Sequence, residues 1–174
     1  MNLSIDFKFG KYIIPRNFII YQGKNFFAMV PPNPILKGRK IKKYNFKKKM
    51  LDILICSKRE VPSISDLSNE EIFDFSLTLQ YLSKKLEQYY KVNSNNISIQ
   101  DGIDSGQTIN HFHAHIIPRI KGDFENGDEI YNKICAFDEE FKKKFNDFIN
   151  DENKKLEVKE EIENFNNFIL KSFI

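Results

Sequence analysis

The sequence predicts an α+β fold in which helices flank an antiparallel sheet. Short runs rich in aromatic and β-branched residues, typical of strands, fill much of the first third of the chain. A long amphipathic segment with helix-start signals follows, and two more strand-like runs come after it. The 174 residues are 41% hydrophobic and include 17 Phe, which suffices for one core and leaves little for a second. We therefore expect a single domain spanning residues 1–174.

The strands of the amino-terminal half are expected to begin as a meander. Pro15 and the turn at residues 22–25 separate the first runs, and three prolines between residues 31 and 34 end the third, because proline cannot donate to a strand ladder. A later run, LDILIC, is apolar and is interpreted as a buried central strand. The expected strands are residues 7–14, 18–21, 26–30 and 51–56.

The helix that follows carries its own start signal. Ser68 and Glu71 have capping-box spacing, and apolar residues recur at steps of three and four as far as about Tyr90. Residues 96–100 and 111–117 are then expected to pair as a hairpin, and their long connection with two glycines is typical of a functional loop. From residue 138 to residue 174 the pattern is charged and helical, which we interpret as a carboxy-terminal extension.

The net charge of +3 conceals a local basic run. Residues 37–49 hold eight basic and no acidic side chains, so the rest of the chain has 19 basic against 24 acidic residues. Such a run can bind nucleic acid or act as a nuclear address. It lacks a helical stripe of anchoring residues, so we interpret residues 37–50 as a solvated insertion and expect no nucleic-acid partner.

The cysteine content and the first residues favour a reducing compartment. Only Cys56 and Cys135 are present, which excludes a disulfide framework. The first residues lack the apolar stretch of a secretion signal, and no window approaches the roughly 18 apolar residues of a membrane span. We expect a cytoplasmic protein, with the nucleus as a second compartment and no membrane partner.

The three histidines of the chain lie within five residues, in the stretch NHFHAHIIPR. Alternate side chains of a strand share a face, so His111, His113 and His115 are expected to form one polar row. Imidazole titrates near neutral pH, and crowding opposes protonation of all three rings at once. A neutral, nucleophilic imidazole is therefore expected.

A metal site is the main alternative for this row, because His-x-His on a strand can present two nitrogens to zinc or iron. A further ligand would have to come from a carboxylate such as Asp52 or Asp101, because the chain has no other histidine and neither cysteine has ligand-like spacing. We favour the nucleophile and expect no metal bound by the protein.

The stretch QDGIDSGQTINHFHAHIIPRIKGDF resembles the histidine-triad superfamily, whose pattern alternates three histidines with apolar residues. Its flanking motifs, together with FKFG, FAMVPPNPILKG and EIYNKI elsewhere, are most similar to the fragile-histidine-triad branch of dinucleoside triphosphate hydrolases. The resemblance implies a compact α+β fold that pairs into a homodimer. It also implies hydrolysis of dinucleoside polyphosphates, of the diadenosine triphosphate or tetraphosphate type, at the α-phosphate.

The resemblance also implies roles for individual residues. His113 would attack the α-phosphate and form a nucleotidyl-histidine intermediate, which water resolves to release a nucleoside monophosphate. His115 would contact the phosphates and leaving group, and His111 would support the geometry. Gln100 and Gln107 match family glutamines near the phosphate path. The expected apolar walls for base and ribose are Phe9, Ile14 and Met29.

Two positions depart from the family pattern. Pro31 stands where the family has a ribose-holding Asn, and Asn33 is expected to replace it. A fourth histidine common in the family is absent, and its position falls near Asp52. No tightly bound cofactor is expected, although Mg2+ or Mn2+ would accompany the substrate phosphates. Two other functions stay open: a nucleoside phosphoramidase using the same intermediate, and a nucleotide-binding signalling module with slow turnover.

Overall fold

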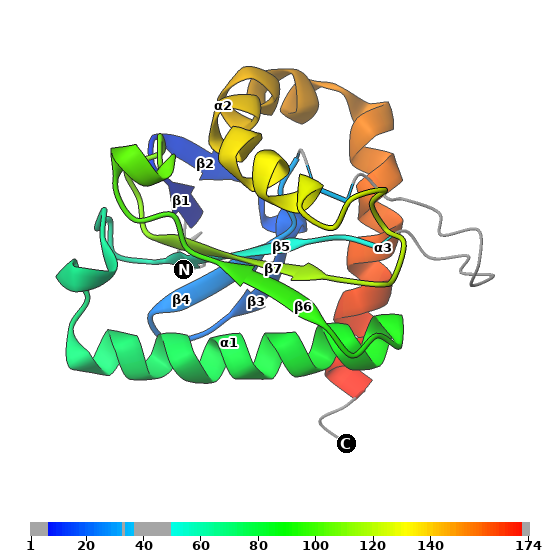
Figure 1. The fold of residues 1–174 in the computed structure, drawn as a ribbon, viewed down its shortest axis with the longest axis horizontal. Coiled ribbons are helices and arrows are strands. Elements are labelled where there is room, and N and C mark those ends of the chain that lie inside the picture. Colours follow the sequence, from blue (N-terminus) through cyan, green and yellow to red (C-terminus); the bar gives the residue numbers. More distant parts are fainter. Residues whose placement is uncertain (1–6, 33, 37–49, 172–174) are drawn as a thin grey trace, which may run out of the picture.

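The computed structural model describes residues 7–32, 34–36 and 50–171, and within them the main sheet has five antiparallel strands (Figure 1). The fold class expected from the sequence is confirmed. The central strand lies in the apolar run LDILIC, but it covers Ile53–Ser57 instead of the expected residues 51–56. In spatial order the strands are β3 (Ile19–Gln22), β4 (Phe26–Met29), β5 (Ile53–Ser57), β7 (His113–Pro118) and β6 (Asn95–Ser98).

A separate two-stranded hairpin precedes this sheet, formed by β1 (Phe7–Phe9) and β2 (Tyr12–Ile14). The expectation of one strand over residues 7–14 is therefore wrong. Gly10 has φ of 56°, a left-handed conformation that glycine adopts without steric penalty, and the chain reverses there. Strand-like residues continue on both sides of the turn, so the two arms look like one strand in the sequence.

One face of the sheet is covered by α1 (Asn69–Tyr90), whose predicted capping box is present. The backbone N–H of Glu71 donates to Ser68 Oγ at 3.3 Å, and the backbone N–H of Ser68 donates to Glu71 Oε2 at 2.8 Å. The ring of Phe75 packs against Phe26 and Phe112, with centroids 5.5 and 5.2 Å away. Aromatic contacts thus join this helix to the sheet.

The opposite face is covered by α2 (Glu129–Asn150), and α3 (Glu152–Lys171) follows it (Figure 1). The described part of the region expected to be helical from about residue 138 lies in these two helices, but α2 begins nine residues earlier and buries Ile130 and Ile134. Helix α3 packs against α1, where the Tyr89 and Phe165 ring centroids lie 5.0 Å apart. Short 3-10 helices occur at Arg16–Phe18, Ile64–Asp66 and Ile103–Ser105.

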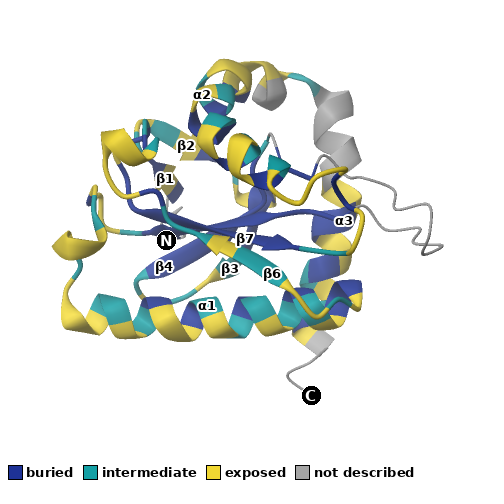
Figure 2. Ribbon diagram, in the orientation of Figure 1, coloured by how far each residue is buried: buried dark blue, intermediate teal, exposed yellow. Residues whose placement is uncertain are grey.

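The core lies on both faces of the central strands, and every residue of β4, β5 and β7 is buried (Figure 2). Strands that are covered on both faces read as nearly continuous apolar runs, as LDILIC does. Within the described residues, none of the helices is both long and apolar enough to cross a lipid bilayer. The basic run at residues 37–49, which makes up nearly all of the expected insertion, lies outside the described residues.

Candidate active site

Strand β7 directs His113 and His115 to the face of the sheet covered by α2. In the register with β5, His113 lies opposite Cys56 and His115 opposite Leu54. His111 lies before the strand, which begins at His113, so the expectation of a strand from residue 111 is wrong. The backbone N–H of Phe112 donates to the carbonyl of Val61 at 2.6 Å, outside the ladder between β5 and β7. All three imidazoles are nevertheless fully buried and close together.

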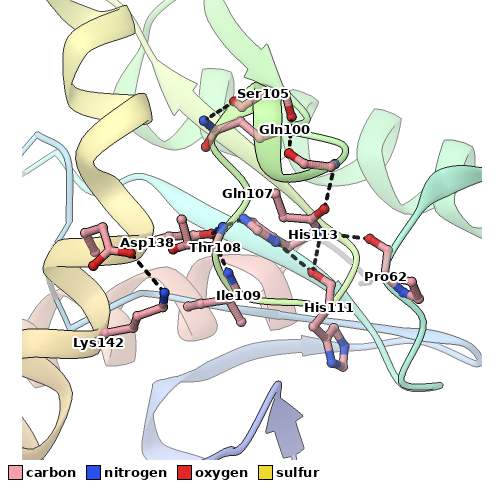
Figure 3. A network of polar contacts seen from close by, with 12 residues as sticks. Pro62, Gln100, Ser105, Gln107, Thr108, Ile109, His111, His113, Asp138 and Lys142 are labelled. Carbon is pink, nitrogen blue, oxygen red and sulfur yellow. Dashed lines mark hydrogen bonds and ion pairs between the residues drawn. The ribbon is translucent and has the colours of Figure 1, made fainter.

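The ring of His113 is held by one hydrogen bond that fixes its tautomer (Figure 3). Its Nδ1 lies 2.9 Å from the carbonyl oxygen of His111. A carbonyl can only accept, so Nδ1 carries a proton, and in the neutral form of the ring the lone pair is on Nε2. The Phe9 ring packs edge-on against this imidazole, with centroids 4.9 Å apart. The nitrogen with the lone pair is therefore fixed in orientation.

The His111 ring is bound on both nitrogens by backbone groups. The N–H of Gly10 donates to Nδ1 at 3.2 Å, and Nε2 donates to the carbonyl of Ser57 at 2.7 Å. Burial is the main cause that lowers the pKa of His111, and nearby His113 adds to it, against the opposing effect of the Ser57 carbonyl. A neutral ring with both nitrogens engaged suits the supporting role expected for His111.

The ring of His115 is in contact with an aromatic side chain and with the neighbouring imidazole. Its ring meets Phe137 of α2 edge-on, with centroids 4.7 Å apart, and the His113 ring is 5.4 Å away. Burial, together with His113, lowers the pKa of His115 to about 3, although Asp138 opposes the change. This imidazole is therefore neutral at pH 7, and neither nitrogen has a hydrogen-bond partner among the described residues.

A carboxylate from α2 completes the site, and the sequence reasoning missed it. Asp138 is fully buried, and its Oδ2 accepts the backbone N–H groups of Thr108 at 2.8 Å and Ile109 at 2.9 Å. Its Oδ1 lies 3.5 Å from Nε2 of His113, too far for a strong hydrogen bond, and the two groups form an ion pair only when that nitrogen is protonated. Burial raises the pKa of Asp138, but His113 and the two amides together hold that pKa below its usual value.

Gln107 fastens the loop that carries these amides. Its Nε2 donates to the carbonyl of Pro62 at 2.7 Å and, more weakly, to that of His111 at 3.4 Å. Its Oε1 accepts the N–H of Gly102 at 2.8 Å. In this conformation the amide of Gln107 binds protein groups on both sides (Figure 3). Its expected place on the phosphate path stays a prediction.

Gln100 and Gly106 fit together within the same loop. The Nε2 of Gln100 donates to the carbonyl of Ser105 at 2.7 Å. Gly106 has φ of +92°, and a Cβ built there would lie 2.4 Å from Nε2 of Gln100. The backbone conformation thus favours glycine, and a Cβ at this position would also push the Gln100 amide from its place. The substrate role expected for Gln100 stays a prediction.

The expected apolar walls differ in their relation to the histidines. Phe9 contacts both His113 and His111 through its ring. Met29 lies opposite Leu54, which itself lies opposite His115, so Met29 belongs to the same face of the sheet. Ile14 is buried in the hairpin opposite Phe7, and Asn33 lies outside the described residues.

The carboxylates considered as metal ligands have other partners. Asp52 accepts the backbone N–H of Leu36 at 3.2 Å, and burial raises the pKa of Asp52 to about 7 against the backbone hydrogen bonds. Asp101 is exposed and accepts from Ser63 at 3.0 Å. In the part of the chain that the structure describes, no group of three or more His, Cys, Asp or Glu residues is arranged to hold a metal ion.

Known proteins share both the sequence and the fold of this chain. Residues 45–122 match the family described as HIT domain. The bis(5'-adenosyl)-triphosphatase of Dictyostelium discoideum is 39% identical over 126 residues, which cover 72% of this chain and 76% of that protein. The bifunctional bis(5'-adenosyl)-triphosphatase/adenylylsulfatase FHIT of Arabidopsis thaliana is 36% identical over 139 residues, which cover 80% and 70% of the two chains.

A solved structure superposes over much of the fold. The diadenosine triphosphate hydrolase of Plasmodium falciparum, in complex with cyclomarin A, has a TM-score of 0.60 and 26% sequence identity to this chain. The superposition covers 82% of this chain and 88% of that one. The arrangement of strands and helices described above is therefore similar to that of a known protein.

Proposed function

Because this chain belongs to the histidine-triad (HIT) family, we propose that it hydrolyses dinucleoside polyphosphates at the α-phosphate, with diadenosine triphosphate as the reference substrate. The observation that carries the proposal is the His113 ring, whose Nδ1 is bound to the His111 carbonyl, so that in the neutral ring the lone pair is on Nε2. A fixed imidazole with a free lone pair is a nucleophile that needs no separate base.

The reaction proceeds in two displacements. Nε2 of His113 forms a bond to the α-phosphorus, and the bond from that phosphorus to the bridging oxygen breaks, which releases a nucleoside diphosphate from the triphosphate substrate. Water then attacks the same phosphorus, the phosphorus–nitrogen bond breaks, and a nucleoside monophosphate leaves. His115, a neutral ring beside His113, contacts the phosphates, and a proton delivered to the leaving oxygen assists the first step.

A surface hollow near this loop supports a path for the leaving half of the substrate. It has a volume of about 300 Å3 and is lined by residues that include Pro62, Ser63, Gln107 and Thr108. Gln107 and Thr108 belong to the loop beside His113, so a polyphosphate chain leaving the α-phosphorus would pass along them. Mg2+ or Mn2+ enters bound to these phosphates, because phosphate oxygens are the ligands such ions prefer.

The expected homodimer is part of the proposal. Strand β6 lies at the edge of the main sheet, and edge strands can pair with another copy. Exposed apolar side chains on α1 and β6 add to this surface, with Phe73 67% and Leu77 and Ile97 each 49% exposed. Sedimentation of the wild-type chain and of a Phe73→Glu variant tests it: a monomeric wild type would contradict the dimer.

The test of the reaction is replacement of the nucleophile. His113→Ala removes the attacking atom and few binding contacts, so kcat for diadenosine triphosphate is expected to fall by roughly 10³-fold or more, while nucleotide affinity changes by less than about tenfold. Circular dichroism checks that the variant is folded. Retained turnover in a folded variant contradicts the mechanism.

A covalent adduct supplies the positive evidence. One nucleoside monophosphate is expected on His113 when the wild-type reaction is quenched without acid and digested for mass spectrometry, because phosphoramidate bonds are acid-labile. An adenosine phosphoramidate assayed in parallel separates the hydrolase from a phosphoramidase. A kcat/KM higher for the phosphoramidate than for diadenosine triphosphate would favour the phosphoramidase.

A further inference from the structure

The nucleophile of this site is closed off by the protein itself. His113 and His115 are fully buried, although a phosphorus atom must approach Nε2 of His113 for the reaction to occur. The cover comes from α2, where Phe137 packs against His115 and Phe141 packs against Phe9 with centroids 5.2 Å apart. Substrate cannot reach the nucleophile while α2 lies in this position.

The group that α2 places at the nucleophile is an anion. Oδ2 of Asp138 accepts two consecutive backbone amides, and Oδ1 lies on the lone-pair side of His113. Two adjacent N–H groups that converge on one oxygen form an anion-binding site, the geometry that proteins use for phosphate. The Asp138 carboxylate therefore has the charge and the hydrogen-bond partners that a substrate phosphoryl group would have beside His113.

The carboxylate satisfies this polar site only in part. Several fully enclosed polar atoms around it have no hydrogen-bond partner among the described residues, which is uncommon in folded proteins. They are Nε2 of His113 and both ring nitrogens of His115. A phosphoryl group has more acceptor oxygens than a carboxylate and would accept from the ring N–H of His115 as well.

We propose that α2 is an autoinhibitory element whose Asp138 carboxylate occupies the α-phosphate position, so that nucleotide binding requires α2 to withdraw. The inference rests on the proposed function for the identity of the ligand, and on the geometry of this chain for the closure. In the closed state the carboxylate and a substrate phosphate compete for the same two amides. Apparent affinity is then reduced by the fraction of molecules that are open.

The contacts argue against a role for Asp138 in orienting the nucleophile. A group that orients an imidazole binds the nitrogen that does not react, and Nδ1 of His113 is already bound to the His111 carbonyl. Asp138 instead faces the reacting nitrogen, and its short hydrogen bonds go to Thr108 and Ile109. An orienting carboxylate and a competing one give opposite predictions when the charge is removed.

The first test is Asp138→Asn, with Asp147→Asn as the matched control. Both remove one negative charge from α2, but Asp147 is exposed on the helix. The asparagine at position 138 fills a similar volume and keeps one oxygen that can accept the two amides, but it carries no charge, and hydrogen bonds to a neutral oxygen are weaker than those to a carboxylate. AMP affinity by calorimetry and kcat/KM for diadenosine triphosphate are expected to rise about tenfold in Asp138→Asn and to stay unchanged in the control.

The outcomes separate this inference from the proposed function. One outcome is that the wild type hydrolyses diadenosine triphosphate while a folded Asp138→Asn variant has equal or lower kcat/KM and AMP affinity. That result overturns the autoinhibition and leaves the proposed hydrolase activity standing. If no form hydrolyses diadenosine triphosphate but Asp138→Asn still binds AMP more tightly, the proposed activity fails and the closure stands.

A second measurement needs no variant and covers the case in which Asp138→Asn does not fold. Amide hydrogen exchange of the wild type is followed with and without saturating AMP. Peptides from residues 129–150 are expected to exchange faster with AMP bound, because α2 must leave the phosphate position, while α1 serves as the internal reference. Unchanged or slower exchange in α2 at saturation overturns the inference.

Discussion

The burial of His115 predicts a specific dependence of stability on pH. The pKa of this ring is about 3 in the folded protein, against an ordinary value of 6.5. Between these two values the unfolded chain binds a proton that the folded protein excludes. The contribution of His115 to the free energy of unfolding is therefore fully present above pH 6.5 and is lost as the pH falls toward 3. The difference between the two pKa values corresponds to about 5 kcal/mol over the whole interval.

The measurement uses His115→Asn, which cannot titrate in this range. The free energy of unfolding is obtained from urea titrations followed by circular dichroism, at pH values from 7.5 to 4.5. Relative to the variant, the wild type is expected to lose roughly 2.5 kcal/mol over this window. Comparison with the variant is essential, because Asp52 gives the wild type an opposite trend. Parallel curves, within roughly 0.5 kcal/mol, would refute the reasoning and mean that His115 is solvated and its face of the sheet open.

Two further predictions concern groups outside the histidines. Burial raises the pKa of the Asp52 carboxyl from 3.8 to about 7, so its contribution to the free energy of unfolding is present below pH 3.8 and is lost as the pH rises to 7. Asp52→Asn should remove this loss of about 4 kcal/mol, measured by urea unfolding over that pH range. An unchanged dependence of the free energy of unfolding on pH would contradict the burial. Gly106→Ala should lower the free energy of unfolding by about 2 kcal/mol or more, through backbone strain and collision with Gln100. The control Gly122→Ala, with positive φ but open space around the new Cβ, should lower it by roughly 1 kcal/mol. Equal losses in the two variants would exclude the collision.

The elements that local chemistry determines were predicted well from the sequence. The capping box at Ser68 and the regular apolar spacing after it describe α1 almost to the residue, because both signals act within a few turns of one helix. The histidines were also found from their alternation. Their burial was not, because it depends on the packing of α2 across the sheet.

Asp138 shows why part of the site could not be predicted. The charged pattern from residue 138 onward was interpreted as a helical extension, and an acidic residue on a helix is usually solvated. One signal was present: Asp138 lies on the same face as Ile134 and Phe141, at spacings of four and three residues. A charge within an apolar stripe needs a buried partner, but the sequence does not reveal that the partners are the amides of Thr108 and Ile109.

The attachment of α2 to the rest of the chain has a consequence for the competition at His113. After the carboxyl end of α2 the chain continues into α3. Helix α3 is fixed to α1 by a hydrogen bond in which the hydroxyl of Tyr89 on α1 donates to Glu161 on α3 at 3.0 Å. The carboxylate of Asp138 is thus an intramolecular ligand, which the fold holds beside its binding site at a fixed local concentration. A dissolved nucleotide competes against that fixed local concentration, so diluting the protein does not open the site.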